Sequence, residues 1–152
     1  MIVLGHRSDE VAAAIRTSGE TRIVLNPDYR QGQATSLRVG LEALADDSHA
    51  AVVILGDQPA VDAGKVGAVV ASYLESASPV VQATYGGRPG HPVLFDKSTW
   101  PDLLAIDGDK GARELLKMHP EWVRTVELGG EVPADLDTWA DYERLKKLWA
   151  TR

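Results

Sequence analysis

The chain has 152 residues, no cysteine and a net charge of −6. This length is typical of one domain with a substantial hydrophobic core, so we expect residues 1–152 to form a single domain. The acidic balance argues against non-specific nucleic-acid binding, and the lack of cysteine excludes disulfides, thiolate metal sites and a cysteine nucleophile. No apolar run is long enough to cross a membrane and no secretory leader is evident, so we expect a cytoplasmic location.

Apolar runs that predict strands alternate with amphipathic stretches that predict helices along most of the chain. Alternation of this kind is typical of a three-layer α/β domain with a mostly parallel sheet. The glycine-rich stretch 86–90 predicts a five-residue hairpin connection, so one strand should be antiparallel. The expected strands are 1–4, 22–25, 50–55, 79–85, 91–95 and 123–128, and the expected helices begin near residues 8, 34, 61, 97, 108 and 138.

The stretch 50–59 ends an apolar run with Gly56-Asp57-Gln58-Pro59. Six apolar residues without alternation predict a central strand covered on both faces, while Gly56 permits a sharp turn and Pro59 ends the strand. Asp57 then lies at the carboxyl end of a strand, where open α/β sheets bind ligands, and its carboxylate suits a hard cation such as magnesium. A cap on the following helix is an equally good interpretation of Asp57.

Thr35 and Ser36 fall in the first turn of the helix expected from residue 34. Hydroxyls and unpaired amides there can meet an anion or a ribose, although helix capping is the commoner role. Arg38 lies one turn further on and is consistent with a solvated surface cation.

Two further stretches, 86–91 and 108–113, combine glycines with polar residues. The glycines of the first stretch favour a hairpin, and they also permit close approach of a substrate. His91 precedes a proline, and a lone histidine is more often structural; the four histidines show no zinc spacing. In the second stretch, Asp109 is a good N-cap beside two glycines, and this pattern alone is a weak sign of phosphate binding.

Near the C-terminus, Thr138 and Asp141 have nearly the spacing and chemistry of a capping box. Asp137 directly precedes this cap, so it either favours the helix dipole or supplies a second metal carboxylate. Apolar residues at helical spacing in the terminal helix are expected to pack inward. They are Tyr142, Leu145, Leu148 and Trp149.

Five motifs in this order make the chain similar to the MobA-like nucleotidyltransferases, and within them to the molybdenum cofactor cytidylyltransferase branch. Each motif alone is weakly specific, whereas all five in order along essentially the whole chain are specific. They are Asn26-Pro27-x-Tyr29-x-x-Gly32-Gln33-x-x-Ser36-Leu37-Arg38-x-Gly40-Leu41, Gly56-Asp57-Gln58-Pro59, Gly90-His91-Pro92-x-Leu94-Phe95, Gly108-Asp109-x-Gly111-Ala112-Arg113 and Asp135-Leu136-Asp137-Thr138-x-x-Asp141-Tyr142.

This resemblance implies a Rossmann-like nucleotidyltransferase fold and transfer of a nucleotide from CTP or GTP to the phosphate of molybdopterin, with release of pyrophosphate. It implies that Asp57 and Asp137 are catalytic and hold Mg²⁺. The residues implied to bind the nucleotide are Asn26, Gln33, Ser36 and Gly56. Those implied to bind the acceptor are Gly90, His91, Pro92, Gly108, Asp109, Gly111 and Arg113.

Phosphoryl-type transfer requires positioning and charge neutralisation rather than a covalent nucleophile, which agrees with this set of residues. Two alternatives stay open: transfer to another phosphorylated acceptor, and a non-catalytic module that binds nucleotide or pterin. The non-catalytic alternative arises because this sequence differs from the family pattern. Family members begin with a strand and a glycine-rich loop that carries an arginine and a lysine. This chain is expected to lack that first β-loop-α unit, and Trp139 replaces a family proline.

An exposed sheet edge is expected as a consequence, and it predicts a homodimer. A molybdoenzyme-maturation partner is the other interaction that the resemblance implies.

Overall fold

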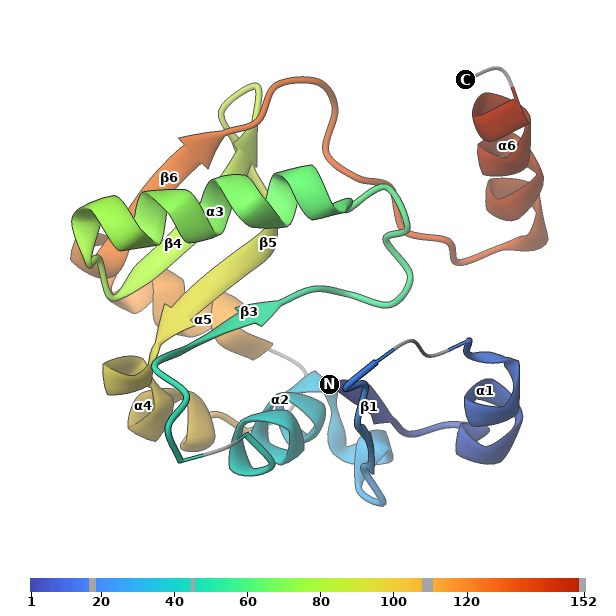
Figure 1. The fold of residues 1–152 in the computed structure, drawn as a ribbon, viewed down its shortest axis with the longest axis horizontal. Helices are drawn as coiled ribbons and strands as arrows, with labels where there is room; N and C mark the ends of the chain where they lie inside the picture. The colour runs from blue at the N-terminus through green and yellow to red at the C-terminus, as the bar shows by residue number, and fades with distance from the viewer. Residues whose placement is uncertain (17–18, 45, 108–110, 151–152) are drawn as a thin grey trace. The chain divides into compact units, whose positions relative to one another are not determined.

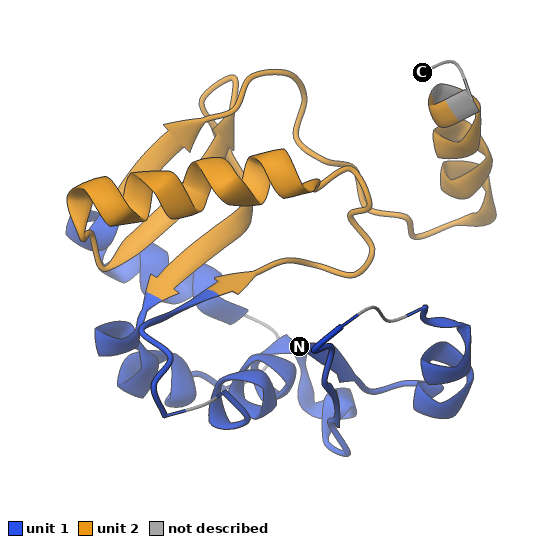
Figure 2. Cartoon of the chain, viewed as in Figure 1, with its two compact units in different colours: residues 1–51, 96–123 blue, residues 52–95, 124–152 orange. Residues whose placement is uncertain are grey.

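The computed structural model describes residues 1–16, 19–44, 46–107 and 111–150 (Figure 1). The chain divides into two compact units, coloured separately in Figure 2. Unit 1 comprises residues 1–51 and 96–123, and unit 2 comprises residues 52–95 and 124–152. Each unit therefore combines two segments that are distant in sequence.

Unit 1 contains a two-stranded parallel sheet covered by a helix. Strands β1 (Ile2–Leu4) and β2 (Ile23–Leu25) pair in register, Ile2 with Ile23 and Leu4 with Leu25. Helix α2 packs on both strands and contacts α4 and α5. The helices of this unit are α1 (Ser8–Ala14), α2 (Gln33–Glu42), α4 (Trp100–Leu104) and α5 (Gly111–Met118), with 3₁₀ turns η1 (Tyr29–Gln31), η2 (Lys97–Thr99) and η4 (Pro120–Trp122).

The second sheet has four strands in the order β3-β5-β4-β6. Its strands are β3 (Ala50–Val53), β4 (Val80–Tyr85), β5 (Arg88–Asp96) and β6 (Val123–Glu127). Strands β3, β4 and β6 run in one direction and β5 in the other (Figure 1). Helix α3 (Ala63–Ser76) packs on β4. The buried residues of this helix and of strands β4 and β5 include Val69, Val80, Val81, Tyr85 and Phe95, all at most 1% exposed. The predicted α/β fold with mostly parallel strands and one antiparallel strand is confirmed.

Strand β3 differs from its prediction. It lies at the edge of the four-stranded sheet among the described residues, and it ends at Val53 rather than Leu55. All four of its residues are half-buried, and Ile54 is 53% exposed. The prediction of a central strand covered on both faces is therefore wrong, because an apolar run does not specify which distant segments pair with it.

The hairpin between β4 and β5 is confirmed, but its connection is shorter than predicted. Tyr85 pairs with Arg88, so only Gly86 and Gly87 form the turn, with φ of 57° and 76°. The favoured two-residue hairpin turn needs positive φ at both central positions, which glycine adopts without steric cost. The rest of the predicted connection, Arg88-Pro89-Gly90, belongs to β5.

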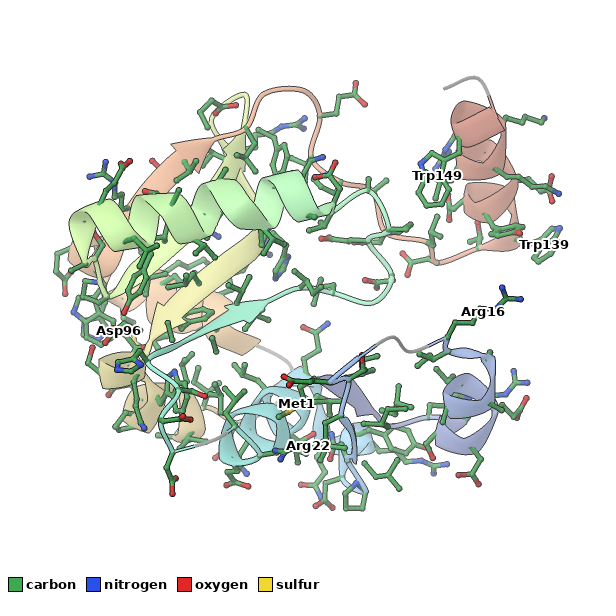
Figure 3. All side chains as sticks on the ribbon, in the orientation of Figure 1. Met1, Arg16, Arg22, Asp96, Trp139 and Trp149 are labelled. Atoms are coloured by element: carbon green, nitrogen blue, oxygen red, sulfur yellow. The ribbon has the colours of Figure 1, made fainter. Side chains whose placement is uncertain are left out.

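The terminal helix α6 (Trp139–Ala150) begins with the predicted capping box. The Asp141 side chain accepts hydrogen bonds from the Thr138 backbone amide (2.9 Å) and hydroxyl (2.6 Å), which lower the pKa of Asp141. The prediction that Tyr142 and Trp149 pack inward is wrong, since they are 43% and 50% exposed. Trp149 and Trp139 of this helix are labelled in Figure 3. The Tyr142 ring stacks instead on Trp139, with ring centroids 5.0 Å apart.

None of the described helices combines the length and apolar composition needed to span a bilayer.

Candidate active site

Two segments of unit 2 that carry predicted metal ligands lie side by side. The Leu136 backbone amide donates to the Asp57 carbonyl oxygen (2.9 Å), and Gln58 Nε2 donates to Asp135 Oδ1 (2.7 Å). Asp137 is the next residue after Leu136, and both Asp57 and Asp137 are exposed. The fold thus places side by side two segments that are far apart in the sequence and that each carry one of the predicted metal carboxylates.

Helix capping, the alternative for Asp57, belongs to a different residue. Asp62 is the N-cap of α3, and its Oδ1 accepts from the Lys65 backbone amide at 2.9 Å. This hydrogen bond, together with one from the Lys65 side chain, lowers the pKa of Asp62. Asp57 is therefore not required for the start of α3.

Gly56 is not required by the turn either, in contrast to its prediction. Its φ lies outside the positive region, and a Cβ added there would meet no atom within 4 Å. The turn is closed by backbone bonds instead: the Gln58 amide donates to Leu55 O (3.3 Å), and the Val61 amide donates to Gln58 O (3.0 Å).

In unit 1, Asn26 organises the start of α2. Its side chain is buried (2% exposed), and Nδ2 donates to the hydroxyl oxygens of Thr35 and Ser36, each at 2.9 Å. Its Oδ1 accepts from the Asp28 amide at 3.0 Å, and its own amide donates to Leu4 O at 2.7 Å. The structure therefore brings Asn26 and Ser36 together, and direct contact of Asn26 with a nucleotide stays a prediction.

Arg38 is more than the solvated cation expected from the sequence. Its guanidinium donates to the carbonyl oxygens of Leu104 (3.3 Å) and Ile106 (3.0 Å) and pairs with Asp107 at 3.0 Å. The last carbonyls of a helix have no partner within it, so a cation that binds them stabilises its end. Arg38 thereby fastens the end of α4 to α2.

The stretch 108–113 follows directly after Asp107, which pairs with Arg38. Gly108 and Asp109 lie outside the described residues. Gly111 begins α5 with φ of 53°, and a Cβ added to it would lie 3.7 Å from Gln33 Oε1. Gln33 and Arg113 are exposed. The structure therefore places two of these predicted binding residues, Gln33 and Gly111, close together in unit 1.

The motif Gly90-His91-Pro92 lies within β5 and packs around Tyr85. A Cβ added to Gly90 would lie 2.9 Å from Tyr85 Cε2, and the Tyr85 hydroxyl donates to His91 O at 2.6 Å. Burial raises the pKa of Tyr85. The His91–Pro92 peptide is cis, and the Pro92 side chain is fully buried. Close backbone packing therefore accounts for Gly90, and acceptor binding by this motif stays a prediction.

Glu127 is a residue that sequence reasoning missed. Its carboxylate accepts from the amides of Gly86 (2.8 Å), Gly87 (3.0 Å) and Gly129 (2.9 Å) and from the Thr84 hydroxyl (3.0 Å). These bonds stabilise the ionised form and lower the pKa of Glu127 to about 2. No local sequence pattern predicts that Glu127 accepts these hydrogen bonds, because most of the donors come from the distant hairpin.

Residues 1–124 match the model of a known family, the MobA-like NTP transferase domain. The match covers well over half of the chain. The chain belongs to the MobA-like NTP transferase family. It is therefore a nucleotidyltransferase, and the family implies a nucleoside triphosphate and a phosphorylated acceptor as its substrates.

Two relatives of known role resemble this MobA-like chain. Molybdenum cofactor cytidylyltransferase of Escherichia coli K12 is 24% identical over 147 residues, which is 97% of this chain and 73% of the relative. Purine catabolism protein PucB of Bacillus subtilis 168 is 28% identical over 124 residues, which is 79% of this chain and 58% of that relative.

Solved structures agree on the fold. Rv0371c of Mycobacterium tuberculosis H37Rv, in complex with manganese, is 33% identical with a TM-score of 0.82, covering 95% of this chain and 76% of that one. The 4-diphosphocytidyl-2C-methyl-D-erythritol synthase of Anaerococcus prevotii has a TM-score of 0.76 at 15% identity, covering 99% and 80% of the two chains. The latter likeness is one of fold alone.

Proposed function

We propose that this nucleotidyltransferase transfers the nucleotide of CTP or GTP to the terminal phosphate of a molybdopterin-type acceptor and releases pyrophosphate, in a magnesium-dependent reaction. The five ordered motifs and the similarity to the Escherichia coli cytidylyltransferase support this acceptor. The observation that carries the proposal is the hydrogen bond between Leu136 N and Asp57 O, because it aligns the segments of the two carboxylates.

Asp57 and Asp137 fit a hard divalent cation. Mg²⁺ is usually held by one or two carboxylates plus substrate phosphates, so a larger protein ligand set is not needed. Among the described residues, no three His, Asp or Glu side chains form a metal cluster. The manganese in the Rv0371c structure supports a divalent cation here. When bound, the cation neutralises phosphate charge and orients the reacting groups.

The other residues of the proposal bind substrates. Asn26 donates to the hydroxyls of Thr35 and Ser36 at the start of α2. In the proposed complex, Asn26, Gln33 and Ser36 line the base and ribose side of the nucleotide. Gly56 approaches the nucleotide through its backbone. The acceptor is bound by Gly90, His91, Pro92, Gly108, Asp109, Gly111 and Arg113. No side chain acts as a covalent nucleophile, because the acceptor phosphate attacks the nucleotide directly.

A transfer assay tests the proposal. The chain is incubated with molybdopterin, Mg²⁺ and either CTP or GTP, and pyrophosphate release and the nucleotidylated product are measured. We expect product with one of the two nucleotides, and loss of product in Asp57→Asn. Asp102→Asn, which changes an exposed carboxylate on α4, should keep the activity. Transfer only to a different phosphorylated acceptor, or nucleotide binding without transfer, contradicts the proposed reaction.

A further inference from the structure

We propose that Gln58 and Asp135 are positioning residues that fix the spacing of Asp57 and Asp137. This inference rests on the proposed function, since it concerns how the fold holds the two metal carboxylates. Gln58 Nε2 lies 2.7 Å from Asp135 Oδ1, and Gln58 is only 8% exposed. Each partner is within two residues of a carboxylate that it would position.

The described residues do not hold the carboxylates of Asp57 and Asp137 directly. No hydrogen bond from a described donor reaches the side chain of Asp57 or of Asp137, so their placement depends on the backbones that carry them. Two hydrogen bonds join the two segments: a backbone bond from Leu136 N to Asp57 O, and a side-chain bond from Gln58 Nε2 to Asp135 Oδ1. One bond alone leaves the segments able to pivot, whereas two bonds at neighbouring positions fix both their spacing and their register.

The orientation of Gln58 supports a specific role for its amide. Its Oε1 is buried without a hydrogen-bond partner among the described residues, which is an unfavourable arrangement for an amide. The side chain nevertheless keeps Nε2 directed at Asp135. Gln58→Leu removes the unsatisfied oxygen together with the bond, so this variant should stay folded while it loses the attachment.

The test measures Mn²⁺ affinity from the electron paramagnetic resonance signal of the unbound ion, with and without CTP and without acceptor. We expect Gln58→Leu and Asp135→Ala each to weaken Mn²⁺ binding by roughly 10-fold or more, the range found for residues that orient metal ligands. The double variant should be no weaker than either single variant, because each change already breaks the same bond. Thermal unfolding of each variant checks that the fold is retained.

Asp135→Asn separates positioning from charge. Its amide oxygen still accepts from Gln58, so Mn²⁺ affinity should stay near that of the unchanged protein. An Asp135→Asn variant as weak as Asp135→Ala would overturn the inference, because Asp135 would then act through its charge. Unchanged affinity in Gln58→Leu would overturn it as well. Glu131→Gln, an exposed carboxylate on the same segment, serves as the matched control and should have no effect.

Failure of the proposed function has a different signature. If the unchanged protein bound no Mn²⁺ in either condition, or if Asp57→Asn bound it equally well, the metal site itself would be wrong and the positioning pair with it. Loss of binding in Asp57→Asn but not in Gln58→Leu would leave the metal site intact and overturn only the positioning role.

Discussion

At the scale of single residues, the lowered pKa of Glu127 predicts how the stability of the fold depends on pH. Its folded pKa of about 2 lies below the ordinary value of 4.5, so the ionised carboxylate stabilises the fold above about pH 4.5. That stabilisation is lost as the pH falls through the folded value. We therefore expect Glu127→Gln to melt below the unchanged protein at neutral pH, with a difference that narrows as the pH falls below about 4.5. Thermal unfolding across this range measures it; a pH-independent difference would contradict the role of ionised Glu127.

Gly90 and Gly56 provide a matched pair of substitutions. The Cβ added by Gly90→Ala would lie 2.9 Å from the buried Tyr85 ring, whereas the Cβ added by Gly56→Ala would have no atom within 4 Å. We expect Gly90→Ala to lower the free energy of unfolding by about 1–3 kcal/mol, as overpacking does. Gly56→Ala should change it by less than about 0.5 kcal/mol. Urea denaturation distinguishes them, and equal effects would contradict the packing described for Gly90.

At the scale of secondary-structure elements, the guanidinium of Arg38 joins two helices of unit 1. Lysine keeps the charge but cannot present several donors in a planar fork, so Arg38→Lys should lose bonds to the end of α4. We expect a loss of about 1 kcal/mol in unfolding free energy. Chemical denaturation of Arg38→Lys beside Arg16→Lys, an exposed control, measures this loss. Indistinguishable stabilities would show that Arg38 does not fasten α4.

The elements themselves were predictable, and their partners were not. Strands and helices follow from local periodicity, and the Thr138–Asp141 cap and the Gly86-Gly87 hairpin follow from local chemistry. Arg38 and Ile106 are 68 positions apart, and Gln58 and Asp135 are 77 apart, so no local pattern relates them. The same limit explains why the edge position of β3 was missed.

In the candidate site, too, some features were predictable from the sequence and others were not. Motif order predicted that Asp57 and Asp137 act together, and the structure places their segments side by side. Burial of Asn26 and Pro92 was not predictable, because burial depends on side chains from elsewhere in each unit.

At the scale of the whole molecule, the edge position of β3 predicts that two copies of the chain can associate. An edge strand presents unpaired amides and carbonyls that can pair with another chain. We therefore expect reversible dimers as the protein concentration rises. Size-exclusion chromatography with light scattering measures the mass directly, and a clean monomer at high concentration would contradict this prediction.

The most direct test of the metal site is calorimetric titration of the chain with CTP and with GTP, with and without Mg²⁺. Asp57→Asn is titrated in parallel, with Asp102→Asn as the control. If Asp57 holds the cation that binds the nucleotide phosphates, one nucleotide should bind only with Mg²⁺, and Asp57→Asn should lose that binding. Nucleotide binding that is independent of Mg²⁺ and unchanged in Asp57→Asn, or no binding of either nucleotide, would contradict it.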